Sequence, residues 1–281
     1  MRAALLALAL LPACSTEEAP SAPPAAAREP FDLVTLIEFE GEGAADLEAV
    51  LEVDDDHDGL ADALEDAAAR AYLPFLSSHP DDACPLSGIV VRVRPHPDDA
   101  ALLHLVYSRL YQDDCGLAGH VGDNEAFGVT VDPARAPPWG LVALRAIGHQ
   151  GTLCERTTTC GSCDGLDACT AAPDGRAVLF SSKDKHAGVV DLGLGCGLLS
   201  CFDTCELSDE PATVPLVNVG EPDAPLVSDL SEQAFVREEL GWTQASLQHY
   251  DPWSDAEFGT AGVVAGDLVD EAFVTPACRA P

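Results

Sequence analysis

The sequence has few basic residues. Only 14 Lys and Arg accompany 48 Asp and Glu in 281 residues, and the formal net charge at pH 7 is −34. Nucleic acids and anionic lipid surfaces are bound through cationic faces, so this balance argues against both as direct partners. The charge fits a surface-exposed protein in a calcium-containing medium; alternatively, it serves only to keep the protein soluble.

The sequence also lacks long apolar runs and the short motifs of common enzymes. Beyond the N-terminus, no apolar segment is long enough to cross a bilayer as a helix, and no internal repeat is present. No GxSxG, HExxH or P-loop pattern occurs, and a Ser-His-Asp set cannot be assembled from the sequence. Function must therefore be inferred from other residues.

The first residues predict export. Met1 and Arg2 precede an apolar run at residues 3–11, which is too short to span a bilayer but typical of a signal peptide. Leu-Pro-Ala-Cys at residues 11–14 resembles the lipobox of bacterial lipoproteins. In that interpretation, residues 1–13 are the signal peptide and Cys14 is lipidated at the cell envelope, on the outer membrane in a Gram-negative host. The alternative is an ordinary export signal cleaved nearby.

The chain that follows Cys14 divides into a tether and a domain. Residues 14–30 are rich in Pro, Ala, Ser and Glu, and predict a flexible tether of up to ~50 Å. Residues 31–281 suit a single domain. We therefore expect membrane contact through the lipid anchor only, and the oligomeric state does not follow from the sequence.

The domain is predicted to be mainly β. Alternating or β-rich runs are separated by Gly, Pro, Asp and Cys clusters. Because no long helical patterns lie between them, they indicate an antiparallel β-sandwich. The predicted strands cover residues 88–95, 101–111, 126–132, 140–148 and 176–182.

Helical patterns are few. Helix is expected only at residues 60–73, where apolar residues recur at helical spacing until Pro74, around 229–240, and at 254–258. Residues 31–40 alternate as a strand does.

The cysteines agree with export. Ten remain when Cys14 is set aside, and an even number in an oxidising compartment indicates up to five disulfides. Four of them follow a C-x5-C-x2-C-x5-C spacing between Cys154 and Cys169, among turn-forming residues that need a covalent link to stay ordered. We predict a disulfide-stapled loop, with a structural zinc site as the alternative. The pairing does not follow from the sequence.

The stretch DDDHDGLADALE at residues 54–65 matches the ligand positions of a twelve-residue calcium loop. Gly59 permits the sharp turn, and dense oxygen ligands favour calcium over transition metals. The loop departs from an EF-hand at Ala61, where a branched apolar residue is usual, and no convincing helix precedes it. The alternative is an acidic turn that binds nothing tightly. The predicted ligands are Asp54, Asp56, Asp58, the carbonyl of Leu60, Asp62 and Glu65.

A second acidic stretch, GHVGDNEAFGVTVD at residues 119–132, places His120 before Asp123 and Glu125 at the head of a predicted strand. Asp123 and Glu125 share strand parity, so both carboxylates leave the same face. In an acidic chain this pattern also arises by chance, and the alternative is a surface turn in which His120 and Asp123 pair.

Three segments in this order resemble the domain shared by the necrosis-inducing protein family and the vacuolar protein sorting 62-like family. They are ARAYLPFLSSHPDD, YSRLYQDDCGLAGHVGDNEAFGV and SSKDKHAGVV, which match a Y-x-P segment after a helix, a G-H-x-x-D-W-E heptapeptide and a strand ending in a His-Ala turn. The resemblance covers about residues 68–190.

The resemblance implies a divalent metal at one edge of a sandwich. Calcium or magnesium is favoured over zinc, and manganese also suits such ligands. The family's later His corresponds to His186. The implied ligands are His120, Asp123 and Glu125, with Asp113 or Asp114 as an upstream acid.

The chain also departs from the family. Asn124 stands where the family has Trp, and Gly122 stands where it has a second His. We therefore carry over the fold and the metal, but not the membrane-lytic activity of the family.

Two classes of function follow. The favoured one is a surface-anchored binding module that holds a polar ligand, such as a glycan or a lipid head group, through bound calcium. The alternative is a metal-dependent hydrolase of esters or phosphodiesters, with His186 or His149 as general acid or base.

Overall fold

The structure is a computed structural model that describes residues 30–37, 44–116, 119, 121–149, 153–161, 169–192, 196–197, 202–221, 224, 233 and 271–275. The predicted lipidation site Cys14, the predicted ligand His120 and the predicted helices at 229–240 and 254–258 lie outside these residues. No helix within the described ranges is long and apolar enough to cross a membrane.

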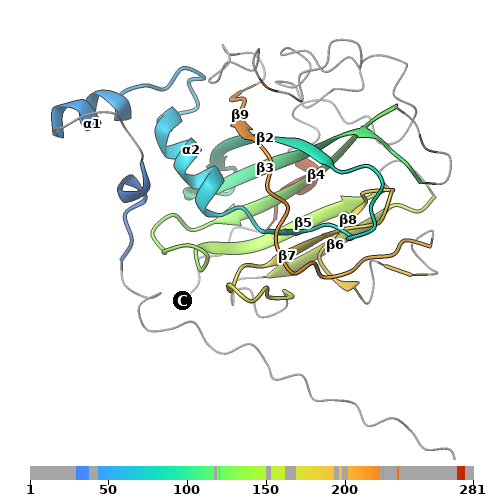
Figure 1. Ribbon diagram of the computed structural model, residues 1–281. Helices are drawn as coiled ribbons and strands as arrows, with labels where there is room; N and C mark the ends of the chain where they lie inside the picture. Colours follow the sequence, from blue (N-terminus) through green and yellow to red (C-terminus); the bar gives the residue numbers. More distant parts are fainter. Residues whose placement is uncertain are drawn as a thin grey trace, which may run out of the picture.

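The described chain forms two sheets and a few short helices (Figure 1). The six-stranded sheet has the order β6-β5-β4-β3-β2-β9, and the three-stranded sheet has the order β1-β7-β8. The predicted β-sandwich class is confirmed, and so are all five predicted strand regions. The elements are the 3-10 helix η2 (Leu33–Leu36), α1 (Ala44–Leu51), α2 (Asp62–Ala71), β1 (Phe75–Ser77), β2 (Leu86–His96), β3 (Asp99–Asp113), β4 (Val121–Val131), β5 (Leu141–Gly148), β6 (Arg156–Gly161), β7 (Val178–Ser181), β8 (Gly188–Val189) and β9 (Leu216–Asn218).

The sheets are not wholly antiparallel, which corrects one detail of the prediction. Strands β1 and β7 pair in parallel, and so do β2 and β9. Parallel pairing needs a long crossover, and about 100 residues separate β1 from β7 and about 120 separate β2 from β9. Such long-range pairings cannot be deduced from local alternation.

The core follows from the alternation in the long strands. Every second residue in the middle of β3 and in the second half of β4 faces the same cluster, because side chains alternate between the two faces of a strand. Tyr107 and Phe127 stack there with ring centroids 4.9 Å apart. The inward residues of these strands are Leu103, Leu105, Tyr107, Phe127, Val129 and Val131.

Helix α2 covers part of this core, as Figure 1 shows. Ala67, Ala68 and Ala69 are buried, and their small side chains let the helix lie close to the sheet. The hydroxyl of Tyr107 donates to the Ala69 carbonyl at 2.8 Å, and so fastens the helix end to β3. The predicted helix at 60–73 is confirmed.

Two helical elements precede the acidic loop, contrary to the prediction. Residues 33–36 form η2 instead of a strand, because Asp32 accepts a hydrogen bond from the Val34 N–H at 3.1 Å and Leu33 is buried against the core. Helix α1 follows, with Asp46 in its first turn, where the helix dipole favours an acid. Alternation over a short segment therefore gave the wrong element type.

Disulfides staple the loops as predicted. Three pairs are described: Cys84–Cys115, Cys160–Cys169 and Cys196–Cys205. Cys154 is also disulfide-bonded. These bonds remove the thiolates that a zinc site in the Cys154–Cys169 segment would need, so the zinc alternative is wrong.

Candidate metal-binding sites

Residues 54–65 fold into a tight loop immediately before α2. Gly59 has φ +94° and His57 has φ +65°, so the chain turns through the left-handed region twice. The carboxylate of Asp54 accepts from the Gly59 N–H at 3.2 Å, and the carboxylate of Asp58 accepts from the Leu60 N–H at 2.7 Å. These contacts draw the acidic side chains inward toward one another.

The carboxylates of this loop converge. The oxygens of Asp54, Asp56 and Asp62 lie within 4.8 Å of one another, and so do those of Asp56, Asp58 and Glu65. Asp56 belongs to both groups. The structure therefore brings together all five predicted carboxylate ligands.

Several of these oxygens are buried without a partner. Glu65 is fully buried, and Asp56 is 5% exposed. Oδ1 of Asp54, Oδ2 of Asp58 and Oε1 of Glu65 are shielded from solvent and accept no hydrogen bond. A buried unpaired carboxylate oxygen is costly, so each of these atoms calls for a proton or a cation.

The crowding of acids shifts their proton affinities. Burial, helped by the charges of Asp56 and Asp58, raises the pKa of Glu65 to about 9. Burial also raises the pKa of Asp58 to about 6, and the pKa of Asp56 and that of Asp62 rise for the same reason. A divalent ion would reverse these shifts, because it favours the charged carboxylates.

This donor set fits calcium. Hard oxygen ligands from several carboxylates at flexible spacing suit Ca²⁺, whereas Mg²⁺ demands a near-ideal octahedron and keeps its water. In the described part of the chain, no Lys, Arg or His side chain forms an ion pair with these five carboxylates. The residues that would hold the ion are those predicted from the sequence.

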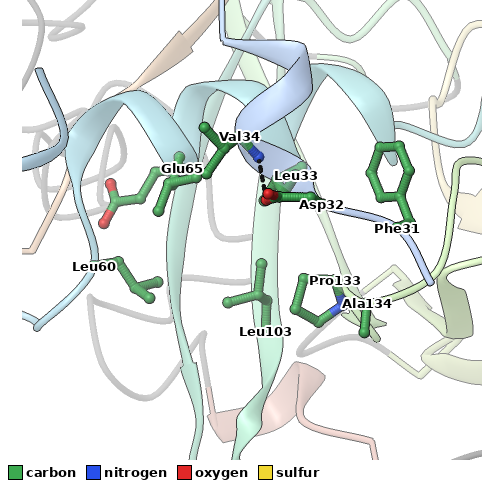
Figure 2. Close-up of a pocket in the computed structure, with 10 residues that line it drawn as sticks. Phe31, Asp32, Leu33, Val34, Leu60, Glu65, Leu103, Pro133 and Ala134 are labelled. Carbon is green, nitrogen blue, oxygen red and sulfur yellow. Dashed lines mark hydrogen bonds between the residues drawn. The ribbon is translucent and has the colours of Figure 1, made fainter. Parts of the chain in front are cut away.

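An apolar cavity of about 270 Å³ adjoins the loop. Figure 2 shows Leu60 and Glu65 on one side of it, with Phe31, Pro133 and Ala134 on the other. The carboxylate of Glu65 points away from Phe31, so the cavity is lined by the carbon stem of this residue. The side chain of Leu60 thus packs toward the core, while its carbonyl remains the predicted ligand.

The second predicted site lies at the opposite end of β3. Leu103 lines the cavity beside Glu65, and Tyr111 stacks on His186 with ring centroids 3.7 Å apart. At ~3.4 Å per residue, these two positions on β3 are about 27 Å apart. The two candidate sites are therefore separate.

His186 is the centre of this second site. It is fully buried, and its Nδ1 lies 2.6 Å from Oδ2 of Asp123. Its Nε2 lies 3.4 Å from Oδ1 of Asp82. Burial opposes protonation, but the hydrogen bonds to these two carboxylates outweigh it and raise the pKa of His186 to about 9. His186 is therefore an imidazolium at neutral pH, with both ring nitrogens donating.

Arg109 is a second buried cation nearby. It donates to the His186 carbonyl at 3.0 Å, to the Tyr111 hydroxyl at 3.2 Å and to the Glu125 carbonyl at 3.3 Å. Burial and the charge of Asp123 raise the pKa of the Glu125 carboxyl to about 8, although Arg109 opposes this rise.

The other predicted residues of this site are only partly assembled. Asp114 accepts from Lys185 Nζ at 2.8 Å and from the Gly116 N–H at 2.7 Å, and Asp113 is exposed. Within the described residues, the groups of three acids that are close enough to share an ion both belong to the 54–65 loop. The second metal stays a prediction, because His120 lies outside the described residues.

Sequence reasoning missed several members of this cluster. Asp82 lies within the quoted SSHPDD segment but was not singled out, and Arg109 and Tyr111 were counted as strand residues. The register of β3 against β4 would have placed two of them at the site, because it pairs Arg109 with Glu125 and Tyr111 with Asp123.

His149, the other candidate acid or base, is held by a partner that was also missed. Its Nε2 lies 2.6 Å from Oδ2 of Asp203. That hydrogen bond raises the pKa of His149, although burial opposes the rise. His149 follows β5 in a turn at φ +53°, so the turn and Asp203 together set the direction of its side chain.

The comparisons with known proteins found similar solved structures only. No family profile and no curated protein matches the chain. A structure of NLPPya in complex with glucosamine shares 14% identity, covers 76% of this chain and 91% of its own, and has a TM-score of 0.41. Necrosis and ethylene inducing protein 2 from the agent of cocoa witches' broom disease shares 12% identity over 72% of this chain and 86% of its own, with a TM-score of 0.36. The non-toxic HaNLP3 protein shares 11% identity over 70% and 83%, with a TM-score of 0.36. The chain is thus similar to necrosis- and ethylene-inducing protein structures, the proteins that its motifs resemble.

Proposed function

We propose that this protein is an extracytoplasmic, lipid-anchored module that binds calcium in the 54–65 loop and holds a polar ligand, such as a glycan or a lipid head group. The lipobox-like residues before Cys14 support the anchor, and the acidic surface supports a role outside the cell.

One observation carries the calcium proposal. Glu65 is fully buried, and one of its oxygens has no partner although Asp56 and Asp58 crowd it. A fold that needed only an acidic turn would leave such a group in solvent. Burying it is favourable once a cation shares the space, since the ion then supplies the missing partner for each orphaned oxygen.

Binding is favoured over hydrolysis by the second cluster. A general acid or base must reach a substrate, but His186 is fully buried and both of its ring nitrogens are directed at carboxylates. His149 is more accessible, and its Nε2 is held by Asp203. We therefore assign ligand contact to the partly exposed Glu125, and to His186 the task of holding Asp123 in place.

Native mass spectrometry and calcium titration by calorimetry test this proposal first. We expect at least one tightly bound calcium in the purified wild-type protein, and loss of that ion in Asp56→Ala. Glu125→Ala should leave the loop ion in place, and it reports separately on the second predicted metal. Absence of any bound ion at millimolar calcium would refute the calcium proposal.

The ligand is tested by binding glucosamine, mannosamine and soluble head groups in calcium and in EDTA. We expect binding that depends on Glu125 and weakens in EDTA. A turnover of ester or phosphodiester probes that is lost in His149→Ala would instead favour the hydrolase.

A further inference from the structure

The calcium loop is in contact with a segment far away in the sequence. Asn218, the last residue of β9, donates from Nδ2 to Oε2 of Glu65 at 2.5 Å, although 153 positions separate them. The N–H of Glu221 donates to Oδ2 of Asp56 at 3.0 Å, across 165 positions. Two of the predicted ligands are therefore oriented from outside the loop.

The side chain of Asn218 is held in the orientation that lets it donate to Glu65. It is 1% exposed, and its Oδ1 accepts from the Gly220 N–H at 3.2 Å, which directs its amide donor toward Glu65. With Oε2 occupied by Asn218, the unpartnered Oε1 is the oxygen left for an ion. Groups that orient a metal ligand in this way set both its geometry and its basicity.

The turn after β9 is fastened to the sheet by two arginines. Arg94 forms a bidentate pair with Glu221, with N–O distances of 2.8 and 2.7 Å, and Arg92 donates to the Gly220 carbonyl at 2.9 Å. The carboxylate of Glu221 is thus paired with Arg94, and its backbone N–H is directed at Asp56.

Strand β9 itself is a weak element. It is three residues long and, among the described residues, lies at the edge of the six-stranded sheet and pairs in parallel only with β2. Short edge pairing gives little stability by itself. Without a cation, the turn at 218–221 must contact a loop whose carboxylates repel one another.

We propose that the calcium site extends beyond the 54–65 loop to Asn218 and Glu221, so that the bound ion fastens α2 to β9 and the edge of the sheet. Asn218 is a positioning residue for Glu65, and the Glu221 N–H positions Asp56. This inference rests on the proposed calcium binding. The bound ion would then also order β9, an edge strand that is remote from the loop in sequence.

Hydrogen exchange with mass spectrometry tests the link in the unmutated protein. Calcium should slow exchange at least about tenfold in peptides that cover residues 216–221, as well as in the loop. Peptides of β1 and β7 in the three-stranded sheet serve as the internal control and should not change.

Calcium titration of Asn218→Ala completes the test, because loss of an orienting group typically weakens metal binding about 10- to 100-fold. The matched control is Leu216→Ala, which weakens the packing of β9 but has no hydrogen bond to the loop. We expect its calcium affinity to stay within about twofold of wild type.

The outcomes separate this inference from the proposed function. If wild type binds calcium but residues 216–221 exchange equally fast with and without it, or if Asn218→Ala binds as tightly as wild type, the link is overturned and the loop site stands. If Leu216→Ala loses as much affinity as Asn218→Ala, the assignment of Asn218 as a positioning residue is overturned. If wild type binds no calcium, the proposed function fails first.

Discussion

Replacement of Glu65 by Gln should have opposite effects with and without calcium. Without the ion, the folded protein holds Glu65 protonated because burial and the neighbouring acids raise its pKa from the ordinary 4.5 to about 9. The unfolded chain ionises this group above its ordinary pKa. The contribution of Glu65 to stability is therefore complete below pH 4.5 and is lost as the pH rises toward 9.

The magnitude follows from these two values. At pH 7, which is about 2.5 units above the ordinary pKa, Glu65 is ionised in the unfolded chain but protonated in the folded protein. At about 1.4 kcal/mol per unit, this difference lowers the stability of the folded protein by about 3 kcal/mol. Gln carries no charge, keeps an oxygen for Asn218 and can donate to Asp56 or Asp58. Glu65→Gln should thus raise the free energy of unfolding by up to about 3 kcal/mol in EDTA, or raise Tm by about 6–12 °C for a domain of this size.

Calcium should invert this order. At a concentration of 1,000 Kd, the ion stabilises wild type by about 4.1 kcal/mol, which exceeds the advantage of about 3 kcal/mol that the variant has in EDTA, whereas the variant, which lacks the charged ligand, gains little from calcium. Thermal unfolding of both proteins in EDTA and in millimolar calcium at pH 7 measures the crossover. The matched control is Glu52→Gln, the same chemical change at an exposed position just before the loop. The reasoning is refuted if the Gln variant is less stable than wild type in EDTA, or if calcium stabilises both equally.

Three further predictions concern the anchor, the separation of the sites and the disulfides. Cys14→Ser should move the protein from the membrane fraction to the soluble fraction; a variant that stays membrane-bound on fractionation contradicts lipidation. The effects of Glu65→Gln and Glu125→Gln on the free energy of unfolding should add within about 0.5 kcal/mol, because the two sites lie far apart, and a larger coupling in denaturant titrations would show that they communicate. Removing the Cys84–Cys115 bond, which closes a loop of 31 residues, should cost about 3–4 kcal/mol on the chain-entropy estimate, and unchanged denaturation midpoints would argue against this pairing.

The convergence of the acids in residues 54–65 was predictable because its information is local. Each predicted ligand follows from a fixed offset within these residues, and Gly59 marks the turn. No fixed sequence offset relates Asn218 and Glu221 to this loop. They reach the loop only because β9 pairs in parallel with β2, a contact that no local pattern encodes.

The strands were predictable for a similar reason, and the segment at 31–40 shows the limit. Alternation in the long runs of β3 and β4 persists over many residues, so the period is unambiguous. The pattern that begins at Phe31 is short, and the Asp32 cap with burial of Leu33 turns it into η2. The second cluster depends on register: Asp123 and Glu125 were found from their own spacing, whereas Asp82 and Arg109 come from other strands and loops.

The two sites differ in what compensates the negative charge of their buried acids. At the second site, a protein side chain supplies positive charge: His186, whose pKa is raised to about 9, is hydrogen-bonded to Asp82 and Asp123 and offsets part of their negative charge. At the loop, the described residues supply no such cation, and the unpartnered oxygen of Glu65 has only other acids around it. A basic residue at the loop would offset the charge of these acids, and the stability of the fold would then not depend on an ion from solution. Under the proposed function, leaving the charge to an external ion would couple the stability of the fold to the calcium concentration, and a calcium-dependent binding module requires this coupling.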